Sequence, residues 1–281
     1  MGETLKIIRT SLSLTQSQLS AGIMTQSNYS KMEKGEIDVP FSKMIALLEK
    51  LGMSVEEFLY VHNHYSQQSA NHLLRLSRLK YNDKERLVQY KKELVSQSTM
   101  TTREQELASI YDALILIADQ NDYETAKQKV EPIWQRLEKH DIWYLYDIQL
   151  LNNILYLFPI DTAISIVSLA LKQLKKYKNL RGINNLSANM QMNLVLLLIQ
   201  HKRYETALAE VERLMDACIR KNLYLHLALC YSRKGLLLDL LGRGGSEPWY
   251  EKGEFLLDVM QNDDLKKEIQ KEIQQYSAST Q

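Results

Sequence analysis

Gln16, Gln26, Ser27 and Lys31 are the residues near the start of this sequence whose side chains could carry out recognisable chemistry. Amide and hydroxyl groups exchange hydrogen bonds with the edges of nucleic acid bases, and an ammonium group pairs with phosphate. Thr25 is typical of a helix N-cap, so a short helix beginning after it would present Gln26, Ser27 and Lys31 on its exposed side. This pattern favours base reading by a helix that enters the major groove of DNA.

Two short helices that meet at a tight turn are needed to position these side chains. Thr15 is expected to cap the first helix, and Gln18 three residues later completes a capping box. The small residues Ala21 and Gly22 suit the turn between the helices. The inward side of the two helices is predicted to consist of Leu19, Ile23, Tyr29 and Met32.

This part of the sequence resembles the DNA-binding domain of phage-repressor-type regulators. Residues 14–35 look like its helix-turn-helix, and residues 45–58 are similar to its last two helices. The resemblance implies that Gln16, Gln26, Ser27 and Lys31 contact DNA. It also implies a structural ion pair between Arg9 and Glu33. The alternative is a small helical bundle with polar caps and no DNA-binding role.

The composition limits the class of protein to which the chain can belong. It has 281 residues, of which 45% are hydrophobic and only 4 are Pro, as expected for about two nearly all-helical domains. We find neither a signal peptide nor an apolar run of the roughly 18 residues that span a bilayer. Neither Cys218 nor Cys230 belongs to a CxxC pair. We therefore expect a cytoplasmic protein with no membrane partner and reduced cysteines.

The charge is close to balanced, with a formal net charge of +1. Residues 1–60 carry six Lys or Arg against seven Asp or Glu. This balance argues against promiscuous nucleic acid binding, but a few placed cations suffice for a specific, dimeric DNA-binding protein.

A linker is predicted at residues 61–69, which divide the chain into a domain at 1–64 and a second domain at 65–281. His62 and His64 lie in this linker and could in principle bind a metal. Because no other ligand lies nearby in the sequence, we favour a solvated linker and expect no metal site and no cofactor.

The second domain contains a weak internal repeat. The sequence Tyr-Glu-Thr-Ala follows a polar turn at both residues 123–126 and 204–207. Small residues recur at separations of 37, 44 and 46 positions, at Ala126, Ala163, Ala207 and Gly253. This spacing resembles tetratricopeptide repeats, which are antiparallel helix pairs stacked into a right-handed superhelix. The helices expected to line its concave groove are residues 106–119, 144–157, 187–200 and 224–241.

Asparagines are unusually frequent on these inner helices, although asparagine is a poor residue for a helix interior. The candidates are Asn152, Asn153, Asn189 and Asn193. A side-chain amide offers a donor and an acceptor together, so it can bind the main chain of an extended peptide of any sequence. The alternative is that these asparagines are solvated or cap helices.

A helix-turn-helix joined to such repeats resembles the Rgg-type regulators of Gram-positive bacteria. The resemblance implies a cytoplasmic quorum-sensing receptor that binds promoter DNA as a homodimer and takes a short hydrophobic peptide in its groove. It further implies that arginines hold the peptide, for which Arg75 and Arg78 are candidates. RNA polymerase is a further candidate partner. The alternative is a DNA-binding protein whose repeats form a scaffold for other proteins.

An enzyme is not expected, because the sequence contains no convergent catalytic group. Residues 242–245 are rich in Gly but lack the preceding strand and following Lys of a phosphate-binding loop. Two further patterns have open interpretations. A stripe of Leu265, Ile269, Ile273 and Tyr276 predicts either a capping helix or a dimer contact. The basic residues at 75–92 could touch flanking phosphates or form a solvated helical face.

Overall fold

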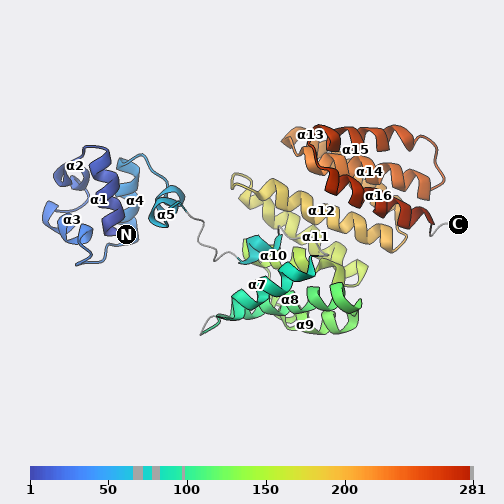
Figure 1. The fold of residues 1–281 in the computed structure, drawn as a ribbon, viewed down its shortest axis with the longest axis horizontal. Helices are drawn as coiled ribbons and strands as arrows, with labels where there is room; N and C mark the ends of the chain where they lie inside the picture. Colours follow the sequence, from blue (N-terminus) through green and yellow to red (C-terminus); the bar gives the residue numbers. More distant parts are fainter. Residues whose placement is uncertain (66–71, 78–82, 97–98, 279–281) are drawn as a thin grey trace. The chain divides into compact units, whose positions relative to one another are not determined.

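The computed structural model describes residues 1–65, 72–77, 83–96 and 99–278. Within these ranges the fold is all-α, as the sequence predicts, with helices and turns but no strand. The chain divides into two compact units, Met1–Asn71 and His72–Gln281 (Figure 1). The first is the helix-turn-helix unit and the second is the tetratricopeptide-like repeat unit. No helix in the described ranges is both long enough and apolar enough to cross a bilayer.

The helix-turn-helix unit consists of five helices around one small core. They are α1 (Gly2–Ser11), α2 (Gln16–Ser20), α3 (Gln26–Glu33), α4 (Phe41–Lys50) and α5 (Val55–His62). The core joins all five helices through the buried side chains of Leu5, Leu19, Tyr29, Leu47 and Phe58. The prediction that His62 lies in a linker is wrong, because α5 continues through it. Its imidazole Nδ1 lies 2.8 Å from the hydroxyl of Thr4 on α1.

The predicted caps of α2 and α3 are both present. The Thr15 hydroxyl accepts a hydrogen bond from the Gln18 amide at 3.1 Å, and the Gln18 side chain accepts one from the Thr15 amide at 2.8 Å. The Thr25 hydroxyl accepts from the Asn28 amide at 3.3 Å. Each cap satisfies a main-chain donor that has no partner within its own helix. The sequence therefore defines where both helices of the motif begin.

The repeat unit is a succession of antiparallel helix pairs. Its first elements are α6 (His72–Ser77), α7 (Lys84–Val95), α8 (Thr102–Gln120), α9 (Tyr123–Leu137) and α10 (Leu145–Ile154). They are followed by α11 (Ile160–Leu174), α12 (Ile183–Gln200), α13 (Tyr204–Lys221), α14 (Tyr224–Leu240), α15 (Glu247–Val259) and α16 (Asp263–Ala278). The four predicted inner helices correspond to α8, α10, α12 and α14. The second is shorter than predicted, because a 3-10 turn at Leu155–Leu157 ends it.

Small residues allow the helices of each pair to approach closely. Ala126, Ala163 and Ala207 are fully buried. A Cβ atom on Gly253 of α15 would lie 2.4 Å from the hydroxyl oxygen of Ser232 on α14. A Cβ atom on Gly235 of α14 would lie 2.8 Å from the ring of Tyr250. The recurring small residues identified in the sequence therefore lie where a larger side chain would separate paired helices.

The C-terminal helix α16 packs on α14 and α15 of its own chain. Ile269 is buried against Ala228 and Leu257, and Leu265 and Ile273 pack beside them. Of the two interpretations left open by the sequence, the capping helix is therefore the one that describes this stripe.

Candidate nucleic-acid interface and the inner face of the repeats

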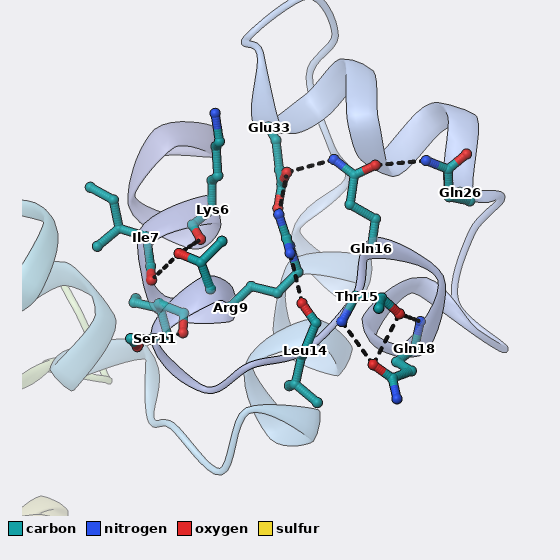
Figure 2. Close-up of polar contacts among 12 residues, drawn as sticks. Lys6, Ile7, Arg9, Ser11, Leu14, Thr15, Gln16, Gln18, Gln26 and Glu33 are labelled. Atoms are coloured by element: carbon teal, nitrogen blue, oxygen red, sulfur yellow. Dashed lines mark hydrogen bonds and ion pairs between the residues drawn. The ribbon is translucent and has the colours of Figure 1, made fainter.

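A buried ion pair joins the first helix to the third. Arg9 on α1 donates from Nε to Glu33 Oε1 at 2.7 Å and from Nη2 to Glu33 Oε2 at 3.1 Å (Figure 2). Only 10% of the Arg9 side chain and 2% of the Glu33 side chain are exposed. Arg9 also donates from Nη1 to the carbonyl oxygen of Leu14 at 2.7 Å, just before α2. The ion pair expected from the family resemblance is thus present, and it also fixes the approach to α2.

Two glutamine side chains extend this ion pair toward the surface. Gln16 donates from Nε2 to Glu33 Oε2 at 2.7 Å, and Gln26 donates from Nε2 to Gln16 Oε1 at 2.6 Å (Figure 2). A carboxylate only accepts hydrogen bonds, so the amino group of Gln16 must face Glu33. Its oxygen is then left to accept from Gln26. This relay directs the carbonyl oxygen of the Gln26 side chain outward.

The charges within this network stabilise one another. Hydrogen bonding to Glu33 raises the pKa of Arg9 above its ordinary value. Burial acts to raise the pKa of Glu33, but hydrogen bonds from Arg9 and Gln16 outweigh it and lower that pKa below its ordinary value. Burial and the neighbouring Glu33 carboxylate also raise the pKa of Tyr29. All three groups therefore keep their usual neutral-pH charge states while α3 is held in place.

Three of the four predicted DNA-contacting residues lie on the exposed side of α3. Gln26, Ser27 and Lys31 are all exposed, whereas Tyr29 and Met32 are buried on the opposite side. Gln16 at the start of α2 is half-buried. The structure therefore brings Gln16 and Gln26 into contact and presents Ser27 and Lys31 on the same helix as Gln26.

Lys50 is a residue of this site that the sequence did not reveal. Its ammonium group on α4 donates to the carbonyl oxygen of Ala21 at 2.6 Å, and to those of Gln18 and Leu19 at 3.3 and 3.4 Å. A cation is favourable at a helix C-terminus, where carbonyl groups lack partners. Lys50 thereby fixes the end of α2 and the start of the turn. Its partners are about thirty positions away, so no local pattern predicts the contact.

The asparagines of the repeat unit form two hydrogen-bonded groups on the inner helices. Asn193 of α12 donates from Nδ2 to the side-chain oxygen of Asn152 of α10 at 3.1 Å, and to its carbonyl oxygen at 3.3 Å. One turn away, Asn189 Oδ1 lies 2.7 Å from Nε2 of His226 on α14. Asn153 donates to the carbonyl oxygen of Gln149 on its own helix at 2.7 Å. We call the surface formed by Asn152, Asn189, Asn193 and His226 the asparagine face.

Comparison with known families identifies the chain. Residues 88–240 match the family model described as HTH-type transcriptional regulator Rgg, C-terminal domain, and residues 5–58 match a helix-turn-helix model. The first match alone covers more than half of the 281 residues. The chain belongs to the Rgg family of transcriptional regulators.

Solved structures share the fold of this Rgg-family chain along almost its whole length. A candidate transcriptional regulator from Listeria monocytogenes EGD-e is 19% identical with a TM-score of 0.80, and the match covers 97% of this chain and 96% of that one. The pheromone receptor Rgg2 of Streptococcus dysgalactiae is 16% identical with a TM-score of 0.77, over 98% and 100%. Bacillus thuringiensis PlcR, solved with the peptide PapR7 and DNA, is 19% identical with a TM-score of 0.69, over 95% and 98%.

Arg75, one of the two arginines suggested as peptide ligands in this Rgg-family chain, already has side-chain partners in the repeat unit. Arg75 on α6 donates to Glu93 Oε2 at 2.6 Å, and its guanidinium lies 3.9 Å from the centre of the Tyr90 ring. Arg78 lies outside the described residues. Other cations of the stretch at 75–92 also have acidic partners, as in the pairs Lys84–Asp119 and Lys91–Asp112. These contacts favour the solvated helical face over a phosphate-binding surface.

Two cavities lie away from the predicted site residues of this Rgg-family chain. One, of about 650 Å³, lies at the start of α8 and the end of α9. It is lined in part by Arg103, Glu106 and Arg136, and Arg136 donates to Glu106 at 2.5 Å and to Asp147 at 3.2 Å. Another, of about 460 Å³, lies between α14, α15 and α16. In the part of the chain that the structure describes, no group of three His, Cys, Asp or Glu is arranged to hold a metal.

Proposed function

We propose that this chain binds promoter DNA as a homodimer and that a short hydrophobic peptide, bound on the repeat unit, controls this binding. Gln16, Gln26, Ser27 and Lys31 would contact DNA. Asn152, Asn153, Asn189 and Asn193 would bind the peptide main chain, and the imported peptide would be met in the cytoplasm. RNA polymerase would be a further partner at the promoter.

The relay from Arg9 to Gln26 is the observation that carries the DNA-binding proposal. A side chain that reads a base must be held in one orientation, because a rotating amide presents donor and acceptor equally. Glu33 fixes Gln16, and Gln16 fixes Gln26. Glutamine in such a position is suited to bind adenine through its carbonyl oxygen and amino group together. A merely structural bundle would not require an ordered amide on the exposed side of α3.

The asparagine face supports the peptide-binding proposal. An extended peptide brings unpaired main-chain amides to the surface it enters, and each one left buried and unsatisfied costs about 1–3 kcal/mol. The inner helix α12 contains no Asp, Glu, Lys or Arg among residues Ile183–Gln200. Its surface therefore suits an uncharged peptide whose main chain is bound by asparagine. Relatives of this fold include the pheromone receptor Rgg2 and the peptide-bound PlcR.

Arg75 and Arg78 have a smaller part in this proposal. A peptide carboxylate would have to displace Glu93 before it could pair with Arg75, which makes Arg75 a secondary contact. We keep both arginines as candidates for the end of the peptide, with the asparagines binding its middle.

Selection of DNA tests the first half of the proposal. The full-length chain would be used to enrich duplexes from a random pool, and we expect two related half-sites in the enriched sequences. Gln26→Ala should reduce discrimination at one base of each half-site, whereas Gln105→Ala, an exposed glutamine of α8, should not. Failure to enrich any sequence would refute specific DNA binding.

Calorimetry with peptides tests the second half. The peptides would be extracted from the medium of the producing cell and fractionated against the full-length chain. Asn152→Ala and Asn189→Ala should each weaken binding about tenfold or more. Asn184→Ala is the matched control, because Asn184 is exposed at the start of the same helix as Asn189. If no fraction binds the parent chain, the protein-scaffold alternative becomes the better account of the repeats.

A further inference from the structure

His226 is a buried residue of α14, and among the described residues its side chain makes one hydrogen bond, to Asn189. Its residue surface is 8% exposed, while Asn189 on the neighbouring helix α12 is exposed. The two helices contact each other, and the bond between His226 Nε2 and Asn189 Oδ1 joins them. Burial of a polar ring is costly unless it makes a hydrogen bond. A hydrophobic residue could fill this space at less cost, so the histidine requires an explanation.

The hydrogen bond fixes the direction of the Asn189 amide. Burial lowers the pKa of His226, so its imidazole is neutral and carries a single N–H. Because Nε2 lies against an oxygen, that nitrogen must hold the hydrogen and act as donor. The oxygen of Asn189 then accepts from His226 and faces the ring. The amino group of Asn189 is turned away from the ring, and no other bond from it is found within the described residues.

We propose that His226 is a positioning residue, which turns the Asn189 amide so that its amino group donates to the carbonyl group of a bound peptide. This inference rests on the proposed peptide-binding function and defines the polarity of that site.

Asn193 presents a hydrogen-bond acceptor where Asn189 presents a donor. Its amino group is used by Asn152, which leaves its side-chain oxygen to accept from a ligand. Asn189 and Asn193 are four residues apart, about 6 Å along a helix that rises 1.5 Å per residue. Two residues of an extended peptide span about 6.6 Å, and groups two residues apart face the same side. Within each such repeat an extended main chain presents one carbonyl group and one N–H group to the same side, so a donor and an acceptor about one repeat apart on the protein can bind neighbouring groups on that side.

A synthetic pool provides a probe that does not depend on knowing the natural peptide. The pool consists of eight-residue peptides made only of Gly, Ala, Val, Leu, Ile, Phe and Ser. The full-length chain would capture its members, and the tightest would be resynthesised with a fluorophore. The affinity of that peptide for each variant would then be measured by fluorescence anisotropy.

Three substitutions separate positioning from packing. His226→Phe keeps a ring but removes the donor, so we expect about tenfold weaker binding. His226→Gln restores an N–H donor and should recover affinity to within about threefold of the parent. Asn189→Asp replaces the donor with a carboxylate that repels a peptide carbonyl, so we expect a loss of more than about tenfold. His140→Phe, at an exposed histidine after α9, should have no effect and serves as the matched control.

Nitrogen NMR of the imidazole gives a readout that does not require a peptide. We expect the hydrogen of His226 on Nε2 in the parent chain. Either a hydrogen on Nδ1, or undiminished binding by a folded His226→Phe variant, would overturn the positioning role alone. If no pool member binds the parent chain although Nε2 carries the hydrogen, the peptide-binding function is overturned, and the positioning role with it.

Discussion

The two units of the chain each contain an Arg–Glu pair with a buried arginine, and the two pairs have different structural roles. In both, the guanidinium donates twice to the carboxylate and once to a main-chain carbonyl oxygen. Arg9 bonds to Glu33 and Leu14, whereas Arg233 of α14 bonds to Glu272 of α16 at 2.8 and 2.9 Å, and to Met192 of α12 at 3.0 Å. In each pair the arginine side chain is 10% exposed.

The two pairs differ in the further partners of their charged groups. Glu33 also accepts from Gln16, which continues to the exposed Gln26. The bonds of Arg233 instead hold α16 against the two inner helices. The Arg9–Glu33 pair orients surface side chains, whereas the Arg233–Glu272 pair holds the last helix of the repeat unit in place. Burial and bond geometry alone therefore do not tell which purpose a pair serves, because only the next partner in the network does.

The largest loss of stability is expected from Arg233→Ala, which should destabilise the repeat unit. Removing one partner leaves a partly buried carboxylate and an unpaired carbonyl group, which costs about 3–5 kcal/mol. All three Trp residues lie in the repeat unit, so urea unfolding followed by Trp fluorescence reports on this unit. Arg213→Ala breaks an exposed i,i+3 pair with Glu210 and should cost under about 1 kcal/mol. Equal losses in the two variants would contradict a structural role for Arg233.

Arg9→Ala should lower the free energy of unfolding of the helix-turn-helix unit somewhat less. We expect a loss of about 3 kcal/mol, at the lower end of the same range. Gln16 would still donate to Glu33, so the carboxylate keeps one hydrogen bond. The relay would lose its anchor, and operator affinity should fall at least about tenfold. Circular dichroism should show an early transition while Trp fluorescence is unchanged. Lys34→Ala, which removes an exposed pair with Glu36, is the control and should resemble the parent in both measurements.

Gln26→Ala and Lys31→Ala should have smaller and distinguishable effects on DNA binding. Loss of Gln26 should cost about 1–3 kcal/mol of discrimination at one base position. Loss of Lys31 should weaken binding to all sequences alike and reduce the salt-dependence slope by about 1, as expected for a phosphate contact. Anisotropy titrations over a range of salt concentrations would distinguish them. Identical profiles for the two variants would rule out these separate roles.

The smallest expected effect is a dependence of the unfolding free energy on acidic pH, through Glu33. The pKa of Glu33 is lower in the folded chain than its ordinary value of 4.5. The stabilisation it provides is therefore complete above about pH 4.5 and is lost as the pH falls through the lower folded-state value. The difference in unfolding free energy between the parent and Glu33→Gln should shrink over this acidic range. A difference that stays constant down to the acid limit would show that Glu33 does not titrate as described.

Local patterns predicted much of the fold. Thr15 and Thr25 cap α2 and α3 because a cap depends on residues three positions apart. Ala126, Ala163 and Ala207 recur because each helix pair needs one close approach. The linker was predicted to begin too early, since α5 continues through His62, whose imidazole contacts Thr4.

The contacts that the sequence did not reveal join residues far apart in the chain. Arg233 and Glu272 are 39 positions apart, and His226 and Asn189 are 37 apart. Nothing in the local sequence around Arg233 or His226 distinguishes either from a solvated residue until the helices are placed. The partners of Asn152 and Asn193 were missed for the same reason: side chains regarded as facing a ligand also bond to each other.

The close contact at Gly253 fixes the spacing between two of the last helices of the repeat unit. Because main-chain atoms and small side chains set the distance between α14 and α15, this spacing cannot be adjusted gradually by exchanging one side chain for a slightly larger one. A single methyl group added at Gly253 would push α15 away from α14. Since α16 packs on both helices, α15 could not move away from α14 without disturbing the packing of α16. The glycine therefore sets the separation of α14 and α15 on which the packing of α16 depends.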